Sequence, residues 1–354
     1  MDVVIDGRIV GPDRPTYFIA DIAANHDGSL ERAKALIRLA KDAGADAAKF
    51  QHFKAAHIVS EVGFNRLGAL SHQASWSKPV VEVYRGASVP DTWTPVLKAE
   101  CDRAGITFFS SPYDFSAVDA LDPYVPAFKI GSGDIDWLEE LRYVAAKGKP
   151  VLLATGAATL DEVVRAVDTL RSVNPQVIVL QCNTNYTASD DNFDHLHLNV
   201  LKTYATIWPE MVLGISDHTQ GNLAVVGAVA LGARVVERHF TDDNHREGPD
   251  HRFALTPAAW RSMVDEVRRL ERALGSSRKF IAGNEIDTVI VQRRCLRARR
   301  DLLPGEKITR EDLDVLRPAT PGAIAPSEIT SVVGRVLRRN RSAGEELRWT
   351  DFGE

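Results

Sequence analysis

The stretch VLGISDHTQGNLAVVGAVALGARVVERHF, residues 212–240, contains two short apolar runs on either side of a longer one. This pattern predicts strands at 212–216 and 234–238 and a helix at 221–231 between them. Parallel neighbours joined by a helical crossover are the expected arrangement. A histidine follows the first strand (His218) and another ends the second (His239). We therefore expect both imidazoles at the same edge of the sheet.

The same alternation recurs along most of the chain. Further strands are predicted at 17–23, 45–51, 106–111, 127–132, 151–156 and 177–183, and further helices at 29–44, 93–104, 137–147, 159–172, 195–205 and 257–274. Short apolar strands indicate burial on both faces, as parallel sheets require. Eight such units in about 275 residues predict a (β/α)8 TIM barrel over residues 1–275. An open doubly wound sheet is the alternative, although no glycine-rich dinucleotide-binding fingerprint follows the first strand.

The regular pattern ends at Gly275. We expect an exposed linker at 276–289 and a small β-rich domain at 290–354, whose strands are broken by proline and glycine. The basic run at 293–300 is interpreted as a solvated face. The segment 56–92 is long for a barrel loop, which is typical of a functional loop or lid at the mouth of the barrel.

Composition and charge exclude several classes of protein. The chain has 43 Lys and Arg against 48 Asp and Glu, a net charge of −5, which gives no general affinity for nucleic acid or anionic membranes. The N-terminus lacks the pattern of a signal peptide, and no apolar run is long enough to span a membrane. Three cysteines are too few for a disulfide framework. We expect a cytoplasmic protein.

Polar residues follow the predicted strands, at the edge where a barrel carries its active site. They include Asp21, Lys49, Gln51, Ser111, Lys129, Ser132, Asp134, Tyr186, Ser216, His218, Glu237 and His239, with Asp250 in the loop after the last strand.

Two lysines, Lys49 in AAKFQ and Lys129 in FKIGS, stand inside otherwise apolar strands. Burying an ammonium group is costly unless an anion compensates it. The pair therefore predicts a binding site for phosphate or carboxylate. Three alternatives stay open: the lysines lie on a rim, pair with Asp or Glu, or form a Schiff base with a carbonyl substrate.

The two histidines at neighbouring strand ends predict one shared divalent metal. Two imidazoles, completed by water and a substrate oxygen, make a Lewis-acid site that is open for catalysis. Hydrogen-bonded structural histidines are the alternative. Glu237 is a candidate general base or substrate contact.

Several longer motifs resemble the sialic acid synthase family. They are NHDGSLERAKALIRLAKDAGADAAKFQ (25–51), FKIGSGD (128–134), LLATG (152–156), SDHT (216–219), GAVALGARVVERHFT (227–241) and GPDH (248–251). The tail, with PGEKITREDLDVLRP (304–318) and VVGRVLRRN (332–340), resembles the antifreeze-protein-like (SAF) domain that ends those chains. The resemblance covers essentially the whole chain, and the motifs occur in the family's order.

The resemblance implies a transferase that condenses phosphoenolpyruvate with an N-acylated hexosamine, such as N-acetylmannosamine, to a nine-carbon 2-keto-3-deoxy acid and phosphate. It implies Mn²⁺ or Mg²⁺ on His218 and His239, and a domain-swapped homodimer in which Arg317 enters the partner's site. Implied contacts to phosphoenolpyruvate are Lys49, Lys129, Ser132, Ser111, Ser216 and Thr184; implied contacts to the sugar are Gln51, Tyr186, Asp250 and Arg317. The candidate catalytic carboxyls are Asp21, Glu237 and Asp134.

The chain departs from the family pattern close to these residues. Asp21 and Asp134 stand where Glu is usual, Ala154 where Ser is common, and Thr184 where Asn is expected. These departures leave the identity of the sugar open: N-acetylmannosamine, its 6-phosphate or a diacetamido-trideoxy hexose. Two other functions also stay open, a Schiff-base aldolase that uses Lys49 or Lys129 and a non-catalytic sugar- or phosphate-binding protein.

Overall fold

The first part of the chain contains eight strands that form one parallel sheet. They are β3 (Tyr17–Asp21), β4 (Ala47–His52), β5 (Thr107–Pro112), β6 (Phe128–Ile130), β7 (Val151–Ala154), β8 (Val177–Cys182), β9 (Val212–Asp217) and β10 (Val235–His239). The sheet order is β5-β4-β3-β10-β9-β8-β7-β6, and β5 lies beside β6, which brings the two ends of the sheet together. The predicted TIM barrel is confirmed, and the doubly wound alternative is wrong because neighbours in the sheet are neighbours in sequence.

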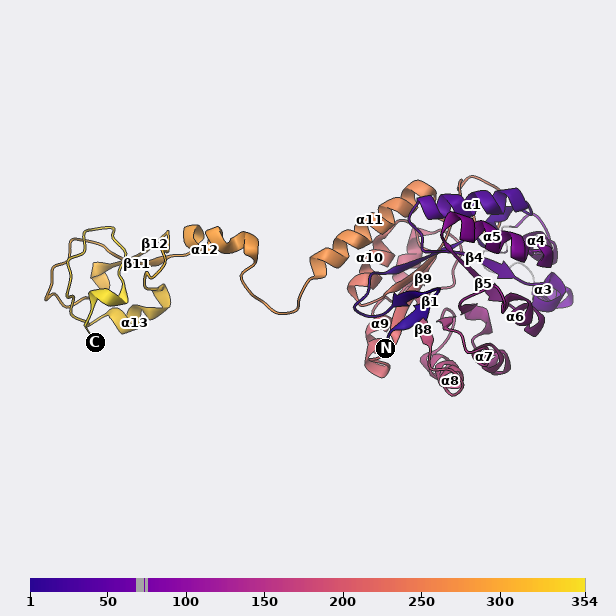
Figure 1. The fold of residues 1–354 in the computed structure, drawn as a ribbon, viewed down its shortest axis with the longest axis horizontal. Coiled ribbons are helices and arrows are strands. Elements are labelled where there is room, and N and C mark those ends of the chain that lie inside the picture. Colours follow the sequence, from indigo (N-terminus) through magenta and orange to yellow (C-terminus); the bar gives the residue numbers. More distant parts are fainter. Residues whose placement is uncertain (68–72, 74–75, 354) are drawn as a thin grey trace. The chain divides into compact units, whose positions relative to one another are not determined.

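The structure is a computed structural model that describes residues 1–67, 73 and 76–353. The chain forms two compact units, Met1–Gly275 and Ser276–Glu354 (Figure 1). Among the described residues, no helix combines the length and the apolar character needed to cross a bilayer.

Helices cover the outside of the barrel (Figure 1). They are α1 (Leu30–Asp42), α5 (Thr94–Ala104), α6 (Phe115–Leu121), α7 (Leu138–Ala145), α8 (Leu160–Arg171), α9 (Val200–Ile207), α10 (Leu223–Ala230) and α11 (Pro257–Leu274). Helix α1 shows why they form: the Ser29 hydroxyl caps its first turn by accepting from the Arg32 N–H, and its apolar stripe faces the sheet. Helix α6 was not predicted.

The amino end of the barrel is filled with apolar side chains. The hairpin of β1 (Val3–Ile5) and β2 (Arg8–Val10) was not predicted, and its apolar residues join an inner core with Tyr17, Ile19 and Phe109. The turn Asp6–Gly7 has positive φ at both residues (50° and 75°), as tight hairpins of this kind require. This end is thus closed, and the polar residues gather at the opposite end.

The segment 56–92 is more ordered than a loop. It contains most of α2 (Ala55–Ile58), all of α3 (Glu61–Leu67) and α4 (Val80–Ala87), and the start of the 3-10 turn η3 (Asp91–Trp93). Residues 68–72 and 74–75 of this segment lie outside the described residues. The long segment after β4 thus carries short helices, and its role as a functional loop or lid stays a prediction.

The second unit has its own small core, in which Leu296, Ile308, Leu313 and Leu347 are buried. Its antiparallel pair is β11 (Cys295–Ala298) and β12 (Leu313–Leu316), and its helices are α12 (Ile286–Gln292) and α13 (Ile329–Val332). The stretch 276–289, which was expected to be a linker, includes the 3-10 turn η6 (Gly283–Glu285) and the start of α12.

Candidate active site

Both lysines of the predicted anion site are buried at the carboxyl end of the barrel. Lys49 on β4 is 2% exposed and Lys129 on β6 is 3% exposed. Lys49 Nζ lies 2.6 Å from Asp21 Oδ2 and 4.0 Å from Glu237 Oε1, and Lys129 Nζ lies 3.2 Å from the same Glu237 oxygen. The ammonium groups thus have carboxylate partners, which was one of the open alternatives, and both approach the same Glu237 oxygen.

The two carboxyls in this network have opposite pKa shifts. Burial raises the pKa of Asp21 by more than Lys49 lowers it. Burial also acts to raise the pKa of Glu237, but Lys129 and Lys49 outweigh it and bring the value to about 2. Glu237 is therefore a fixed negative charge at neutral pH, whereas Asp21 takes up a proton more readily. Neighbouring carboxyls whose pKa values are pushed apart are typical of acid–base sites.

Three of the predicted polar residues complete this network. Ser216 Oγ donates to Glu237 Oε1 (3.2 Å), Gln51 Nε2 donates to Asp21 Oδ2 (3.2 Å), and Ser111 Oγ lies 3.5 Å from Lys49 Nζ. The remaining oxygen of Glu237, Oε2, is buried and has no hydrogen-bond partner among the described residues. A buried acceptor of this kind is normally satisfied by water or a ligand.

The two histidines lie together above this network. The ring centroids of His218 and His239 are 5.4 Å apart. His218 Nδ1 lies 3.0 Å from the Asn183 carbonyl oxygen, which places the proton on Nδ1 and leaves the Nε2 lone pair available. His239 Nδ1 is buried without a hydrogen-bond partner among the described residues. Burial lowers the pKa of His239 to about 3, so its ring is neutral, as a metal ligand must be.

These observations fit a divalent metal held by two protein ligands. No group of three or more His, Cys, Asp or Glu side chains in the described part of the chain is arranged to hold a metal. His218, oriented by a backbone carbonyl, and His239, with an orphaned buried nitrogen, would hold the ion, and water and substrate would supply its other ligands.

Two residues that the sequence analysis missed support the histidines. The Phe253 ring packs 4.8 Å from His239 and 5.8 Å from His218, while the predicted Tyr186 lies 4.5 Å from His218.

On β10, strand alternation places Glu237 and His239 on the site side and Arg238 on the other. Buried Arg238 pairs with Asp217 (3.2 Å) and donates to the carbonyls of Thr219 and Gly221, and so fixes the turn that carries His218.

Ser132, Gly156 and Thr184 lie packed together beside the 3-10 turn η4 (Ser132–Asp134). Ser132 Oγ accepts from the Gly156 N–H at 2.9 Å. A Cβ atom on Gly156 would collide with Thr184 Oγ1 and lie 3.0 Å from Ser132 Oγ, so the glycine lets both hydroxyls approach its backbone. Burial, then the charge of Asp136, raises the pKa of Asp134 to about 6. Two hydroxyls and a backbone amide thus meet beside the turn that also carries Asp134.

Asp250 connects the histidines to a large cavity. Its Oδ2 accepts from the Ala24 N–H (3.2 Å) and lies 3.7 Å from His239 Nδ1. The cavity has a volume of about 1500 Å³, and its lining includes Tyr186, part of α4 and the loop 244–249. Arg317 belongs to the second unit, where its Nε donates to the Gln292 carbonyl (2.6 Å). Its predicted contact with a sugar stays a prediction.

Comparisons with known proteins show the family of the chain and agree with its fold. A model described as the NeuB family matches residues 36–279, and the SAF domain matches residues 293–353. The chain is 36% identical to N,N'-diacetyllegionaminic acid synthase of Legionella pneumophila, covering 96% of this chain and 95% of that protein. It is 33% identical to human N-acetylneuraminate-9-phosphate synthase, with 93% and 90% covered. The solved structure of the N-acetylneuraminic acid synthetase of Leptospira borgpetersenii, in complex with citrate, matches with a TM-score of 0.71 and 27% identity over 82% of this chain and 95% of that one.

Proposed function

The chain belongs to the NeuB family, and on that premise we propose that it is a transferase that condenses phosphoenolpyruvate with an N-acylated hexosamine. The product would be a nine-carbon 2-keto-3-deoxy sugar acid, released with inorganic phosphate. The names of the relatives, synthases of legionaminic acid and of N-acetylneuraminate 9-phosphate, support this reaction class.

The observation that carries the proposal is the burial of Lys49 and Lys129 against the same Glu237 oxygen. The paired histidines adjoin this network, because His239 Nε2 lies 3.7 Å from the Asp21 carboxylate that Lys49 contacts. Two ammonium groups taken out of water cost several kcal/mol unless anions compensate them. Asp21 and Glu237 provide part of that compensation. A phosphate and a carboxylate on one small molecule would add acceptors to the same two cations, and phosphoenolpyruvate carries both groups.

We propose that His218 and His239 hold Mn²⁺ or Mg²⁺. When bound there, the cation would polarise the aldehyde oxygen of the open-chain sugar. The His218 ring is oriented for this role by Asn183, and His239 is kept neutral by burial. Cys182 and Asn183 outweigh the effect of burial and raise the pKa of His218, so a proton competes with the cation for Nε2 as the pH falls.

The chain's own residues would bind and orient the two substrates. Lys49 and Lys129, with Ser111 and Ser216, would hold phosphoenolpyruvate, and Ser132 and Thr184 would contact its phosphate beside the Gly156 N–H. Gln51, Tyr186 and Asp250, with Arg317 from the partner subunit's SAF domain, would hold the sugar. Fixing the methylene carbon beside the aldehyde makes the encounter effectively intramolecular, which lowers the barrier by up to roughly 7–11 kcal/mol.

In the proposed reaction the methylene carbon of phosphoenolpyruvate forms a bond to the aldehyde carbon. Water then adds to C2, and the C2–O bond to phosphate breaks to leave the ketone. Of the three candidate carboxyls, Glu237 is the weakest base, since its pKa is about 2. We assign the water's proton to the Asp134 carboxylate, whose pKa of about 6 suits a general base near neutral pH. Asp21 is the second candidate.

A substrate panel tests the proposal. The enzyme would be incubated with phosphoenolpyruvate, Mn²⁺ and each of three acceptors: N-acetylmannosamine, its 6-phosphate and a diacetamido-trideoxy hexose. We expect acceptor-dependent phosphate release, a product of matching mass and loss of activity with a chelator. Condensation of pyruvate with the acceptor, without release of phosphate, would instead support the aldolase, and borohydride should then trap pyruvate covalently on a lysine. No turnover with any acceptor would favour the binding protein.

The metal assignment has its own test. Mn²⁺ binding would be measured by calorimetry for His218→Ala, His239→Ala and the exposed control His195→Ala. We expect binding to be lost in the first two variants and kept in the control, with circular dichroism unchanged. Full Mn²⁺ affinity in both site variants would refute the assignment.

We further propose that the protein acts in the cytoplasm as a domain-swapped homodimer, without nucleic-acid or membrane partners. Mixing inactive Arg317→Ala and His218→Ala subunits tests the swap. Partial recovery of activity is expected, because one of the mixed sites then has both intact residues. No recovery in a dimer shown to exchange subunits would argue that each subunit supplies its own Arg317.

A further inference from the structure

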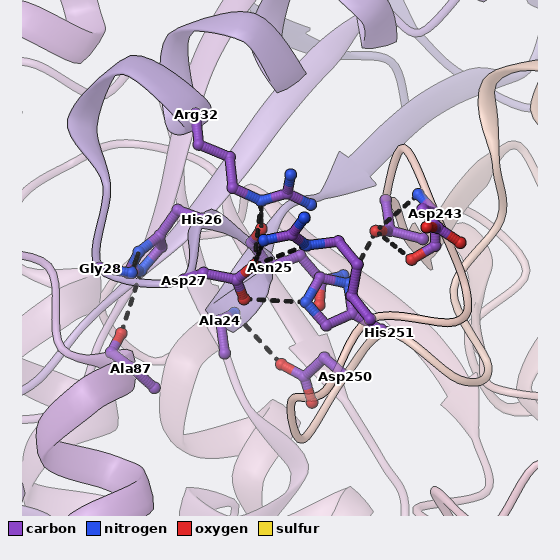
Figure 2. Close-up of polar contacts among 12 residues, drawn as sticks. Ala24, Asn25, His26, Asp27, Gly28, Arg32, Ala87, Asp243, Asp250 and His251 are labelled. Carbon is purple, nitrogen blue, oxygen red and sulfur yellow. Dashed lines mark hydrogen bonds and ion pairs between the residues drawn. The ribbon is translucent and has the colours of Figure 1, made fainter.

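One short turn contacts both walls of the cavity above the site. Residues Asn25–Gly28 connect β3 to α1 through the 3-10 turn η1 (Ala23–His26), and they lie at the centre of Figure 2. One wall of the cavity is formed by α4, including Gly86 and Ala87, and another by the loop 244–249. None of the roles assigned above uses His26 or Asp27.

His26 ties the turn to helix α4. Its Nδ1 accepts from the Gly28 N–H at 3.0 Å, so the proton lies on Nε2, which donates to the Ala87 carbonyl at 3.2 Å (Figure 2). The side chain is fully buried, and its ring packs edge-on against Trp93 at 5.6 Å. Burial lowers the pKa of His26, which keeps the ring in the neutral form that this pair of bonds requires.

Asp27 ties the turn to the opposite wall. Its Oδ1 lies 2.9 Å from His251 Nε2, and the other ring nitrogen, Nδ1, lies 2.7 Å from Thr241 Oγ1. His251 is fully buried, so both of its nitrogens are satisfied inside the protein. The loop passes directly over this ring: a Cβ atom on Gly248 would lie 2.6 Å from His251 Cδ2.

Two arginines reinforce Asp27. Arg246 Nη2 lies 2.7 Å and Arg32 Nε 3.2 Å from Asp27 Oδ2, and Arg32 also makes two bonds to Asp242 (2.5 and 2.8 Å). Burial acts to raise the pKa of Asp27, but His251 and Arg246 outweigh it and lower the value. Asp27 is therefore ionised at neutral pH. The loop 242–251 is held at one end by Arg32 on Asp242 and at the other by Asp27 on His251.

We call these contacts of His26 with Ala87 and of Asp27 with His251, Arg246 and Arg32 the clasp. The clasp contacts the site through Asp250. Asp250 directly precedes His251 in sequence, and its carboxylate accepts from the Ala24 N–H within η1 (Figure 2). The turn and the loop are therefore joined at two places, Ala24 to Asp250 and Asp27 to His251. The same carboxylate lies 3.7 Å from His239 Nδ1. A change at Asp27 therefore displaces a residue that faces the proposed metal ligand, without touching Lys49 or Lys129.

We propose that His26, Asp27 and His251 are positioning residues that set the acceptor end of the active site, by fixing α4 and the loop 242–251 against one turn. This inference rests on the proposed function, because it assigns the cavity to the sugar. It requires that loss of the clasp weakens the sugar and spares phosphoenolpyruvate, whose proposed ligands lie on the strands.

Asp27→Asn is the first test, since it keeps the shape of the side chain and removes its charge. Hydrogen bonds to a charged group are worth enough to change binding by about tenfold or more. We expect the KM for the best acceptor of the panel to rise at least about tenfold, and the KM for phosphoenolpyruvate to stay within about twofold. Equal changes in both KM values, or a lowered Tm alone, would overturn the proposal.

Thr241 gives a matched pair of variants. Thr241→Val removes the hydroxyl that meets His251 Nδ1 and should reproduce the acceptor effect, whereas Thr241→Ser keeps the hydroxyl and should hold the acceptor KM within about threefold. Asp119→Asn is the control, because Asp119 on α6 also accepts from two partners, Tyr143 and Lys147, but lies on the outer layer of the barrel. A similar rise in both Thr241 variants would contradict a role for the hydroxyl.

Hydrogen exchange separates this inference from the proposed function. In Asp27→Asn, amides of residues 80–87 and 242–251 should exchange faster than in the wild type and in Asp119→Asn. If the wild type turns over no acceptor, the proposed function fails, and faster exchange in both segments still establishes the clasp. Unchanged hydrogen exchange in both segments would refute the proposed role of the clasp, whether or not the wild type is active.

Discussion

Lys129 Nζ lies 3.2 Å from Glu237 Oε1, and both side chains are almost fully buried. Glu237→Gln would leave two ammonium groups with one carboxylate between them. Removing one partner of a buried pair costs roughly 3–5 kcal/mol, so we expect a clear fall in Tm. Phosphate should raise the Tm of the variant more than that of the wild type, because the anion replaces the missing charge. An equal shift in both proteins would mean that phosphate binds elsewhere.

Gly156→Ala should displace Thr184, which is a proposed contact to the phosphate. The added methyl group would collide with Thr184 Oγ1, so this hydroxyl must leave its place beside Gly156. We expect the KM for phosphoenolpyruvate to rise by about tenfold or more while the acceptor KM changes little. Gly133→Ala, in the connection between β6 and α7, is the control because a Cβ there meets nothing within 4 Å. Equal effects of the two substitutions would mean that the phosphate is not held beside Gly156 and Thr184.

The pKa of Asp134, about 6, predicts the pH profile. A general base must be ionised, so kcat should be low below pH 6 and rise as the pH rises through that value. Asp134→Asn should lower kcat by about 10²-fold or more and remove this limb of the profile. If the limb persists in Asp134→Asn and disappears in Asp21→Asn, the proton belongs to Asp21.

The strands, and the polar residues on them, could be predicted because both depend on the order of residues within a few positions of the chain. A lysine within AAKFQ or FKIGS interrupts an apolar run, and two histidines in equivalent places after neighbouring strands stand out in the chain. The partners of these residues are not local. Whether Lys49 meets an anion or Asp21 depends on the pairing of β3 with β4, which brings Asp21 and Lys49 opposite each other.

Other features lacked a periodic signal. Helix α6 has seven residues, too few to display a helical pattern, although Asp114 caps it by accepting from the Ala117 N–H. Phe253 lies in an irregular stretch after GPDH, and nothing in its neighbours indicates that its ring packs on both histidines. Arg238 resembles any surface arginine in sequence, and only the burial of β10 reveals its structural role.

Glu140 on α7 predicts how stability depends on pH. It is fully buried, and neither carboxyl oxygen has a hydrogen-bond partner among the described residues. Burial, then the charges of Asp134 and Asp114, raises its pKa to about 8, whereas the unfolded chain has the ordinary value near 4.5. The unfolded state thus loses this proton first. The stability that the protonated group provides is complete below pH 4.5 and is lost progressively as the pH rises to about 8.

Glu140→Met removes this titration and keeps a side chain of similar volume. Relative to the wild type, the gain of the variant in the free energy of unfolding should be roughly 3–4 kcal/mol larger at pH 8 than at pH 5. Denaturant titrations at the two pH values measure the difference. Glu139→Met is the matched control, because Glu139 is exposed on the same turn of the helix and should show no such change with pH. An advantage of the same size at both pH values would mean that the gain comes from packing alone and that Glu140 is not held protonated.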